Sequence, residues 1–303
     1  MNPDRWGSGV SLRRGDAIGV VASGFAVKPA RLRRGLSCLR EMGYQPRIGG
    51  NVTSALGYLA GDDDARLSDL RSMIDAPQVR AIWFARGGYG TARLLDRFPW
   101  RALRQSPKLL IGYSDLTALF GAAVERAGAA CIYGPVVTEL DDAGAFHAPS
   151  LRALLARQPL QLAVRPRQVL AGGRARGRLC GGNLSTLAHL CGTRFFPDLR
   201  GNVLFLEETG EQVYRIDRML NQLRLSGALR GPAAILLGDF SAPRRRRFPT
   251  DRPLDDVLDE FLLPLGVPVI KGLPAGHVRA KRSLPLGART LVDTRAGRIR
   301  FEP

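Results

Sequence analysis

A short apolar run that ends in Gly-Tyr-Ser and passes at once into a helical pattern restricts the fold of this chain more than any other feature. Residues 109–111 predict a buried strand, Gly112-Tyr113-Ser114 follows it, and helical spacing begins at Leu116. A serine on such a tight strand-to-helix turn is held above the sheet, beside the first free N–H groups of the helix. A nucleophile needs this arrangement, because those donors stabilise a developing oxyanion. The same position suits a helix N-cap, so the turn alone leaves both roles open.

Strand-like and helix-like patterns alternate through about the first 140 residues. Residues 16–23 and 81–85 are apolar runs typical of buried parallel strands, as are residues 109–111. Residues 29–42 and 116–127 have the apolar spacing of helices. This alternation predicts an α/β fold with a doubly wound parallel sheet.

The length and composition of the chain are sufficient for two domains. The 303 residues are 45% hydrophobic, so each half can bury its own core. We expect an N-terminal α/β domain at residues 1–140 that carries the serine, a polar, proline-containing linker at 141–172, and a smaller C-terminal domain at 173–303. In that last part, β-like runs such as 203–206 mix with helical segments such as 215–225, which indicates a less regular α/β topology.

The formal net charge of +18 raises the question of a nucleic-acid partner. Only four of the 45 basic residues are lysines, and the arginines are spread along the chain instead of forming one basic arm. This distribution is typical of a biased composition and does not favour nucleic acid as the partner. The one dense run, Arg244 to Arg247, is expected to be a solvated loop, with a local anion or partner site as the alternative.

Targeting and cysteine patterns indicate the compartment. No apolar run approaches the length that crosses a membrane, and the first eight residues lack the pattern of a signal peptide. Four scattered cysteines without C-x-x-C spacing argue against a zinc ribbon or a disulfide framework, and they suit a reducing cytoplasm. We therefore expect a cytoplasmic protein without a membrane segment.

A glycine-rich turn at residues 87–90 follows the apolar run at 81–85. Loops at the carboxyl ends of neighbouring parallel strands meet in one crevice, so this turn and Ser114 are expected to face the same pocket. Because glycine lets a backbone approach a ligand closely, the N–H groups of Gly88 and Asp115 are the expected oxyanion donors. The spacing fits neither a dinucleotide fingerprint nor a phosphate loop, and a purely structural glycine turn is the alternative.

A serine nucleophile needs a base, and the chain has three histidines. His189 lies in an apolar helical segment and His147 in the polar linker, whereas His277 follows Leu-Pro-Ala-Gly in a loop with a restricted backbone. That setting makes His277 the expected base. Glu207 directly follows an apolar run and is the acid expected to orient the histidine, while Glu208 is expected to serve the start of the next helix.

Five motifs in series resemble those of the LD-carboxypeptidases, the muramoyltetrapeptide carboxypeptidase family of serine peptidases. They follow the order of the family and cover nearly the whole chain. The motifs are Gly87-Gly88-Tyr89-Gly90, Gly112 to Thr117, Gly181-Gly182-Asn183-Leu184, Phe205-Leu206-Glu207 with Tyr214 to Leu220, and Gly276-His277 with Leu284 to Gly287. The serine turn lacks the second glycine of the G-x-S-x-G elbow, so an α/β-hydrolase fold is not assigned.

The resemblance implies a flavodoxin-like doubly wound domain and a smaller, swivelling β-rich α/β domain, in cytoplasmic homodimers without a metal or other cofactor. It implies a Ser114–Glu207–His277 triad that removes the terminal D-alanine from a murein tetrapeptide in cell-wall recycling. The partner is then a small muropeptide, not a membrane or a nucleic acid. Two alternatives remain open: a microcin-immunity-type peptidase of the same family that cleaves peptide–nucleotide antibiotics, and a non-catalytic basic protein that binds anions or nucleic acids.

Overall fold

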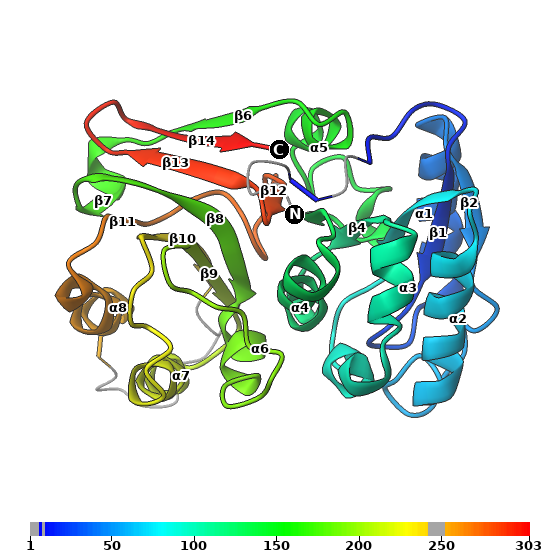
Figure 1. Cartoon of the computed structure of the whole chain (residues 1–303), viewed down its shortest axis with the longest axis horizontal. Helices are drawn as coiled ribbons and strands as arrows, with labels where there is room; N and C mark the ends of the chain where they lie inside the picture. The colour runs from blue at the N-terminus through cyan, green and yellow to red at the C-terminus, as the bar shows by residue number, and fades with distance from the viewer. Residues whose placement is uncertain (1–5, 8–9, 242–251) are drawn as a thin grey trace.

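Two β-sheets lie side by side and form the framework of the molecule (Figure 1). The computed structural model describes residues 6–7, 10–241 and 252–303. The first sheet comes mainly from the N-terminal half of the chain and the second mainly from the C-terminal half. None of the helices in these described ranges is long and apolar enough to cross a membrane.

The N-terminal half alternates strands with helices. Its elements are β1 (Ala17–Val21), α1 (Pro29–Glu41), β2 (Gln45–Ile48), α2 (Asp63–Asp75), β3 (Val79–Phe84), the 3-10 helix η1 (Thr91–Arg97), α3 (Trp100–Gln105), β4 (Leu109–Gly112), the 3-10 turn η2 (Ser114–Leu116), α4 (Thr117–Ala127), β5 (Cys131–Tyr133) and the 3-10 turn η3 (Val137–Glu139). Five parallel strands take the spatial order β2-β1-β3-β4-β5. This flavodoxin-like order reverses between β1 and β3, so right-handed crossovers place helices on both faces. The predicted doubly wound sheet is confirmed.

Local sequence signals account for several of these elements. The buried face of α1 carries Leu32, Leu36 and Leu39, at the three- and four-residue spacing of one helix face. The α2 helix begins where the sequence predicts a polar break. Asp62 is its N-cap, and the Asp62 carboxylate accepts a hydrogen bond of 2.7 Å from the backbone N–H of Ala65.

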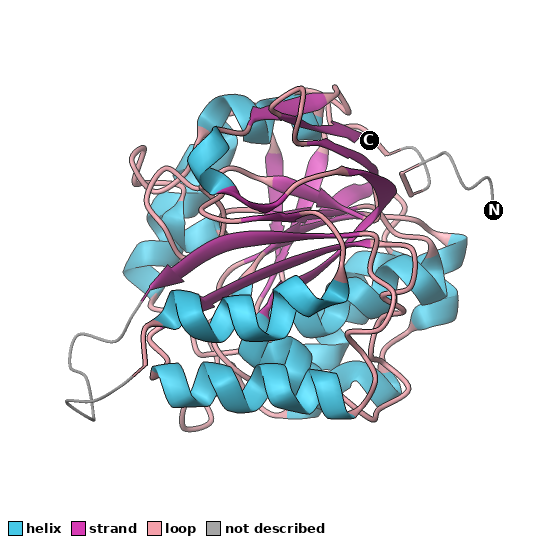
Figure 2. Ribbon diagram, turned by 90° about the vertical axis from the view of Figure 1, so that its left-hand side faces the viewer, coloured by secondary structure: helices cyan, strands magenta, loops and turns pink. Residues whose placement is uncertain are grey.

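The C-terminal half forms a larger, curled sheet. Its elements are α5 (Ala148–Leu155), β6 (Leu160–Ala163), η4 (Pro166–Gln168), β7 (Val169–Ala171), β8 (Arg174–Asn183), α6 (Leu184–His189), β9 (Val203–Thr209), α7 (Val213–Leu225), β10 (Ala234–Ser241), α8 (Leu254–Leu262), η5 (Leu263–Leu265), β11 (Val269–Ile270), β12 (Leu284–Leu286), β13 (Arg289–Asp293) and β14 (Arg298–Glu302). The sheet order is β6-β14-β13-β8-β9-β10-β11-β7, with β8 to β11 parallel and the outer pairs antiparallel. The α7 and α8 helices lie beneath this sheet (Figures 1 and 2).

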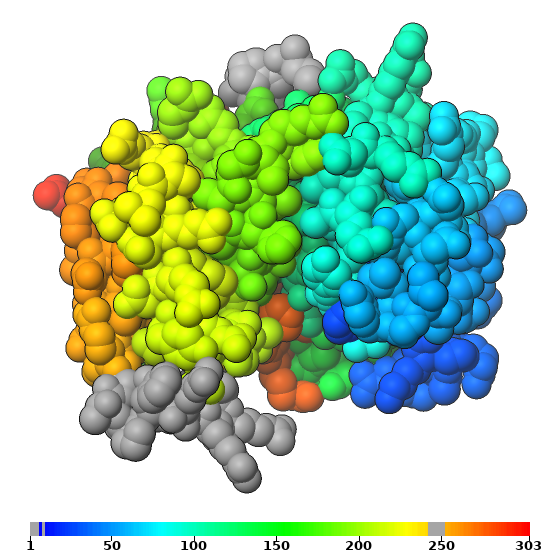
Figure 3. Space-filling view, turned by 90° about the horizontal axis from the view of Figure 1, so that it is seen from below, coloured from blue at the N-terminus to red at the C-terminus, as the bar shows by residue number. Residues whose placement is uncertain are grey.

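The two halves share strands and a packed junction. The C-terminal strand β12 joins the first sheet as an antiparallel neighbour of β5. At the end of β8, a Cβ on Gly182 would lie 2.4 Å from Thr117 Oγ1, and the N–H of Asn183 donates to the same oxygen at 2.9 Å. Seen from below, the halves adjoin, and a notch between them exposes orange-red atoms of the C-terminal part (Figure 3). The junction therefore brings the end of β8 against the start of α4.

Candidate active site

Ser114 lies on a strained turn between β4 and α4. It is the first residue of η2, and its φ of 67° is in the left-handed region, which costs a non-glycine residue about 1–3 kcal/mol. Gly112 permits the close turn, because a Cβ there would lie 3.2 Å from Leu116 Cγ. The N-cap alternative does not hold for this serine, since Leu116 is the N-cap residue of α4 and the Ser114 hydroxyl faces His277 instead.

His277 connects the serine to an acid. Its Nε2 lies 3.1 Å from Ser114 Oγ, and its Nδ1 lies 2.8 Å from Glu207 Oε2. Because an ionised carboxylate only accepts hydrogen bonds, Nδ1 carries the proton and Nε2 is left to accept from the serine hydroxyl. Gly276 makes this approach possible: its φ is 102°, and a Cβ there would lie 2.6 Å from Glu207 Oε2.

Glu207 is fully buried. The sequence suggests a position just after the strand, but β9 continues to Thr209, so Glu207 lies within it, opposite Asn183 of β8. Its carboxylate accepts from the Tyr133 hydroxyl at 2.6 Å and from the backbone N–H and Nδ1 of His277 at 3.2 and 2.8 Å. A buried carboxylate is costly unless it is bonded in this way, so these three donors fix its orientation.

Tyr133, the last residue of β5, links the acid to the serine turn. Its hydroxyl donates to Glu207 at 2.6 Å and accepts from the backbone N–H of Ser114 at 3.1 Å. Burial, and then the charge of Glu207, raise the pKa of Tyr133 well above its ordinary value, so the hydroxyl keeps its proton. Sequence reasoning missed this residue; the available signal was a tyrosine that ends a short apolar run just before Gly134 and Pro135.

The Tyr133→Phe variant is expected to lower kcat about 10- to 100-fold with little change in KM. One hydrogen bond to a charged group contributes about 1.5–3 kcal/mol, and its loss loosens both Glu207 and the Ser114 turn without touching a substrate contact. Steady-state peptide hydrolysis measures both constants. Tyr44→Phe is the matched control, because Tyr44 lies at the opposite, amino-terminal end of the strands. A rise in KM alone, or an equal loss in the control, would contradict this positioning role.

The glycine-rich turn lies against the serine. A Cβ on Gly87 would lie 3.0 Å from Ser114 Cβ and 3.4 Å from its Oγ, and Gly88 has a φ of 110°. Within the described residues, no hydrogen bond uses the backbone N–H of Gly88 or of Asp115. Both N–H groups are therefore available to a ligand oxygen, as an oxyanion hole requires.

The Asp115 side chain has a separate, structural contact. Its buried carboxylate accepts from the backbone N–H of Thr91 at 2.9 Å, which ties η1 to the serine turn. Burial raises the pKa of this carboxyl, and the hydrogen bonds from Thr91 oppose that rise. The side chain thus holds two loops together, and its backbone N–H is the part that lies at the site.

Other polar residues considered from the sequence lie elsewhere. The expectation that Glu208 serves the following helix is wrong, because its carboxylate accepts from Asn183 Nδ2 at 3.1 Å and from the Ser185 N–H at 2.7 Å, at the start of α6. The reason is that β9 pairs with β8, which leads directly into α6. Glu208 therefore lies beside the start of α6 and not beside α7. His147 is the N-cap of α5, and His189 ends α6. Neither takes part in the contacts around Ser114.

A cavity of about 460 Å³ opens beside His277. Tyr113 forms part of its wall, with its ring centroid 4.8 Å from that of His277. The Tyr113 hydroxyl donates to Glu139 at 2.7 Å, and the buried Lys281 donates to the Tyr113 hydroxyl at 3.2 Å and to Glu139 at 2.8 Å. Burial and the charge of Glu139 raise the pKa of Tyr113. The wall is thus a fixed polar cluster with groups of both charges.

Comparison with known proteins identifies the family. The profile of the LD-carboxypeptidase N-terminal domain matches residues 18–134, and that of the LD-carboxypeptidase C-terminal domain matches residues 176–292. The chain belongs to the LD-carboxypeptidase family. It is therefore a member of a peptidase family, as the sequence motifs predict.

The arginine run at 244–247, which the sequence predicts to be a solvated loop, lies outside the described residues.

Individual relatives in the LD-carboxypeptidase family match over nearly their full length. The probable murein peptide carboxypeptidase of Bacillus subtilis is 36% identical, over 94% of this chain and 91% of the relative. The murein tetrapeptide carboxypeptidase of Pseudomonas aeruginosa is 34% identical, over 91% and 92%. The crystal structure of muramoyltetrapeptide carboxypeptidase from Oxalobacter formigenes superimposes with a TM-score of 0.84 at 31% identity, over 94% and 97% of the two chains.

Proposed function

We propose that this LD-carboxypeptidase family member is a serine peptidase that removes the C-terminal D-alanine from murein tetrapeptide. One observation carries the proposal: a continuous hydrogen-bonded chain runs from Ser114 through His277 to the buried Glu207. Relatives named murein peptide and murein tetrapeptide carboxypeptidases support the substrate class. The proposal extends to a cytoplasmic homodimer that acts in cell-wall recycling, as the family resemblance implies.

In the proposed reaction, Ser114 Oγ attacks the carbonyl carbon before D-alanine, and His277 Nε2 accepts the hydroxyl proton. The N–H groups of Gly88 and Asp115 stabilise the oxyanion that forms. His277 then gives its proton to the leaving amine, and D-alanine departs. Water, activated by the same histidine, hydrolyses the acyl-enzyme, which releases the tripeptide and restores the serine. Throughout, Glu207 stabilises the protonated imidazole and holds its orientation.

The deciding experiment incubates the purified protein with murein tetrapeptide and measures D-alanine and tripeptide by mass spectrometry. Release of both products in equal amounts is the expected result. A peptidyl-adenylate analogue is the comparison substrate; its cleavage without any release of D-alanine would favour the peptide–nucleotide alternative. Salt-sensitive binding of DNA or RNA, with neither substrate cleaved, would favour the non-catalytic alternative.

A further inference from the structure

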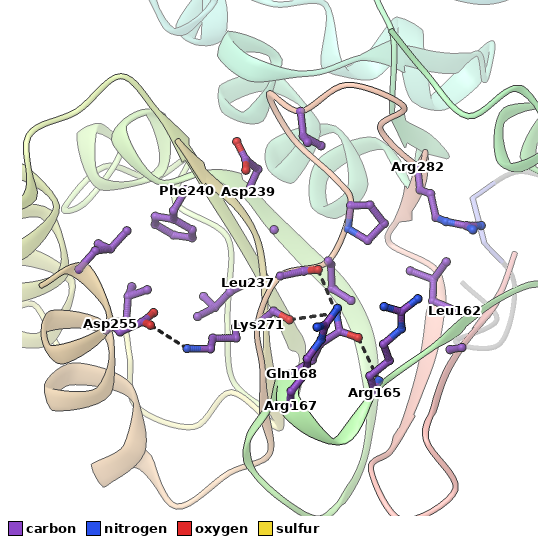
Figure 4. A pocket seen from close by; sticks show the side chains of 18 residues that line it. Leu162, Arg165, Arg167, Gln168, Leu237, Asp239, Phe240, Asp255, Lys271 and Arg282 are labelled. Atoms are coloured by element: carbon purple, nitrogen blue, oxygen red, sulfur yellow. Dashed lines mark hydrogen bonds and ion pairs between the residues drawn. The ribbon is translucent and has the colours of Figure 1, made fainter. Parts of the chain in front are cut away.

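A second cavity, of about 800 Å³, lies in the C-terminal half of the molecule (Figure 4). It is enclosed by β10, α8 and the segments around η4 and β11. Several aliphatic or aromatic side chains give it an apolar lining; these are Leu162, Leu237, Phe240, Leu254 and Leu258. Its volume is in the range that holds a small ligand or a short peptide segment.

Basic side chains also line this cavity. Arg165, Arg167 and Arg282 lie on one side of the cavity, opposite Lys271 and Asp255 (Figure 4). Lys271 Nζ is paired with Asp255 at 2.9 Å, whereas the three arginine side chains have no acidic partner in the described part of the chain. The cavity therefore offers unneutralised guanidinium groups next to apolar surface, which suits a ligand with carboxylates on an aliphatic framework.

The acidic groups of the cavity itself do not neutralise these arginines. Asp255 is held by Lys271, and the Asp239 carboxylate accepts a hydrogen bond from the Ser241 hydroxyl. Among the described residues, neither carboxylate forms an ion pair with Arg165, Arg167 or Arg282, so three guanidinium groups face one carboxylate, Asp239, that has no basic partner, and the cavity keeps a net positive charge.

The wall that carries two of the arginines is held in place. The Gln168 side chain accepts from the backbone N–H of Arg165 at 2.9 Å. The same side chain donates to the carbonyl oxygens of Gly272 and Lys271 at 2.9 and 3.2 Å (Figure 4). These bonds fix η4 against the end of β11, so a ligand meets a preformed wall and little ordering is needed on binding.

This cavity adjoins the loop that carries His277. Pro274 and Val278, on either side of the histidine, both line it, and Val278 also lines the cavity beside His277. The loop is anchored to the cavity wall, because the backbone N–H of Asp239 donates to the carbonyl oxygen of Ala275 at 2.9 Å. The two cavities therefore share Val278 as a lining residue, and the His277 loop borders both of them.

We propose that the arginine-lined cavity is the subsite for acidic residues on the acyl side of the scissile bond. The inference rests on the proposed function. Because only one residue leaves, most of the substrate lies on the acyl side, and we assign this part to the second cavity, which shares Val278 with the cavity beside His277. Arg165, Arg167 and Arg282 bind the carboxylates of that part, and the apolar lining contacts its aliphatic carbons.

The test compares two peptides and two matched double variants. The peptides are murein tetrapeptide and an isosteric analogue in which one acyl-side carboxylate is a carboxamide. Arg165→Ala/Arg167→Ala removes two cavity charges, and Arg33→Ala/Arg40→Ala removes two charges from the exposed face of α1. We expect the cavity variant to raise KM for the acidic peptide at least tenfold and for the carboxamide less than twofold. We expect the control variant to change neither.

An equal rise in KM for both peptides, or no rise, would overturn the subsite. Arg165 and Arg167 are exposed, so both variants should fold, and Arg282→Gln repeats the test from a different segment. Calorimetry with the tripeptide acid separates this proposal from the proposed function. If the wild type releases no D-alanine, the proposed function fails, yet tripeptide binding that only the cavity variants lose still supports the acidic-ligand cavity. Equal tripeptide binding by all variants, or binding that does not compete with substrate, overturns it.

Discussion

Ser114→Ala is expected to lower the rate of D-alanine release about 10⁶-fold, with the fold unchanged. The substitution removes only Oγ, the atom that His277 Nε2 contacts at 3.1 Å, and no acyl-enzyme forms without it. The remaining activity would come from the free N–H groups and from substrate binding. Single-turnover release of D-alanine measures the effect, and mass spectrometry after a serine-directed phosphonate shows whether residue 114 is the labelled position. Undiminished release by the variant would contradict the mechanism.

A second substitution at the same position separates chemistry from backbone strain. Ser114→Gly is expected to be as inactive as Ser114→Ala. Its free energy of unfolding is expected to be about 1 kcal/mol higher, because glycine adopts a φ of 67° without the steric cost that a residue with a Cβ has there. Denaturant unfolding of the two inactive variants gives the difference directly. If the alanine variant were the more stable one, the left-handed serine would not be a site of strain.

Glu207→Gln is the other change with a very large expected effect, a fall in kcat of about 10⁴-fold. The amide keeps the size of the side chain and still accepts the Tyr133 hydroxyl bond, which is 2.6 Å long in the native protein. However, the NH₂ group of the glutamine donates a hydrogen bond to His277 Nδ1. Nδ1 must then accept, which favours the tautomer with the proton on Nε2. That nitrogen then donates to Ser114 Oγ and no longer accepts its proton.

The control for Glu207→Gln is Glu211→Gln. Glu211 is four residues further along the chain, and its carboxylate pairs with Arg215 at 3.2 Å without reaching the histidine. The control should keep kcat within about twofold, since a single partly exposed ion pair contributes little. Pre-steady-state kinetics show whether acylation is the slowed step. A similar loss in both variants would mean that carboxylate charge in general, not the bond to His277, supports the reaction.

Local sequence signals were sufficient to select most of the candidate site. The serine turn is a contiguous run, because a buried strand, Gly112 and a helix start constrain one another within a few residues. Gly276-His277 is equally local, since the glycine conformation that allows the approach to Glu207 is set next to the histidine. Such short-range constraints can be recognised from the residue types and from their spacing along the sequence. The doubly wound sheet was predictable for the same reason, through the alternation of apolar periods.

Contacts between distant segments could not be predicted from the sequence. Tyr133 and Glu207 are 74 positions apart, and only the packing of β5 against β9 brings the hydroxyl to the carboxylate. Glu208 could not be assigned to α6 from its neighbours, because the strand order that places β8 beside β9 is a property of the folded sheet. The same is true of the antiparallel β12, which comes from the C-terminal part and completes the first sheet.

By itself, the sequence determined the α/β class and the family, and it selected Ser114, Glu207 and His277 as the candidate triad, because each depends on a short motif whose backbone requirements are local. Only the tertiary structure decided that Tyr133 connects the acid to the Ser114 turn, that the Asp115 carboxylate accepts from the backbone N–H of Thr91, and that an arginine-lined cavity adjoins the histidine loop. These features join residues from separate strands. Their distances depend on sheet order and on the junction of the two halves, which residue spacing along the chain does not encode.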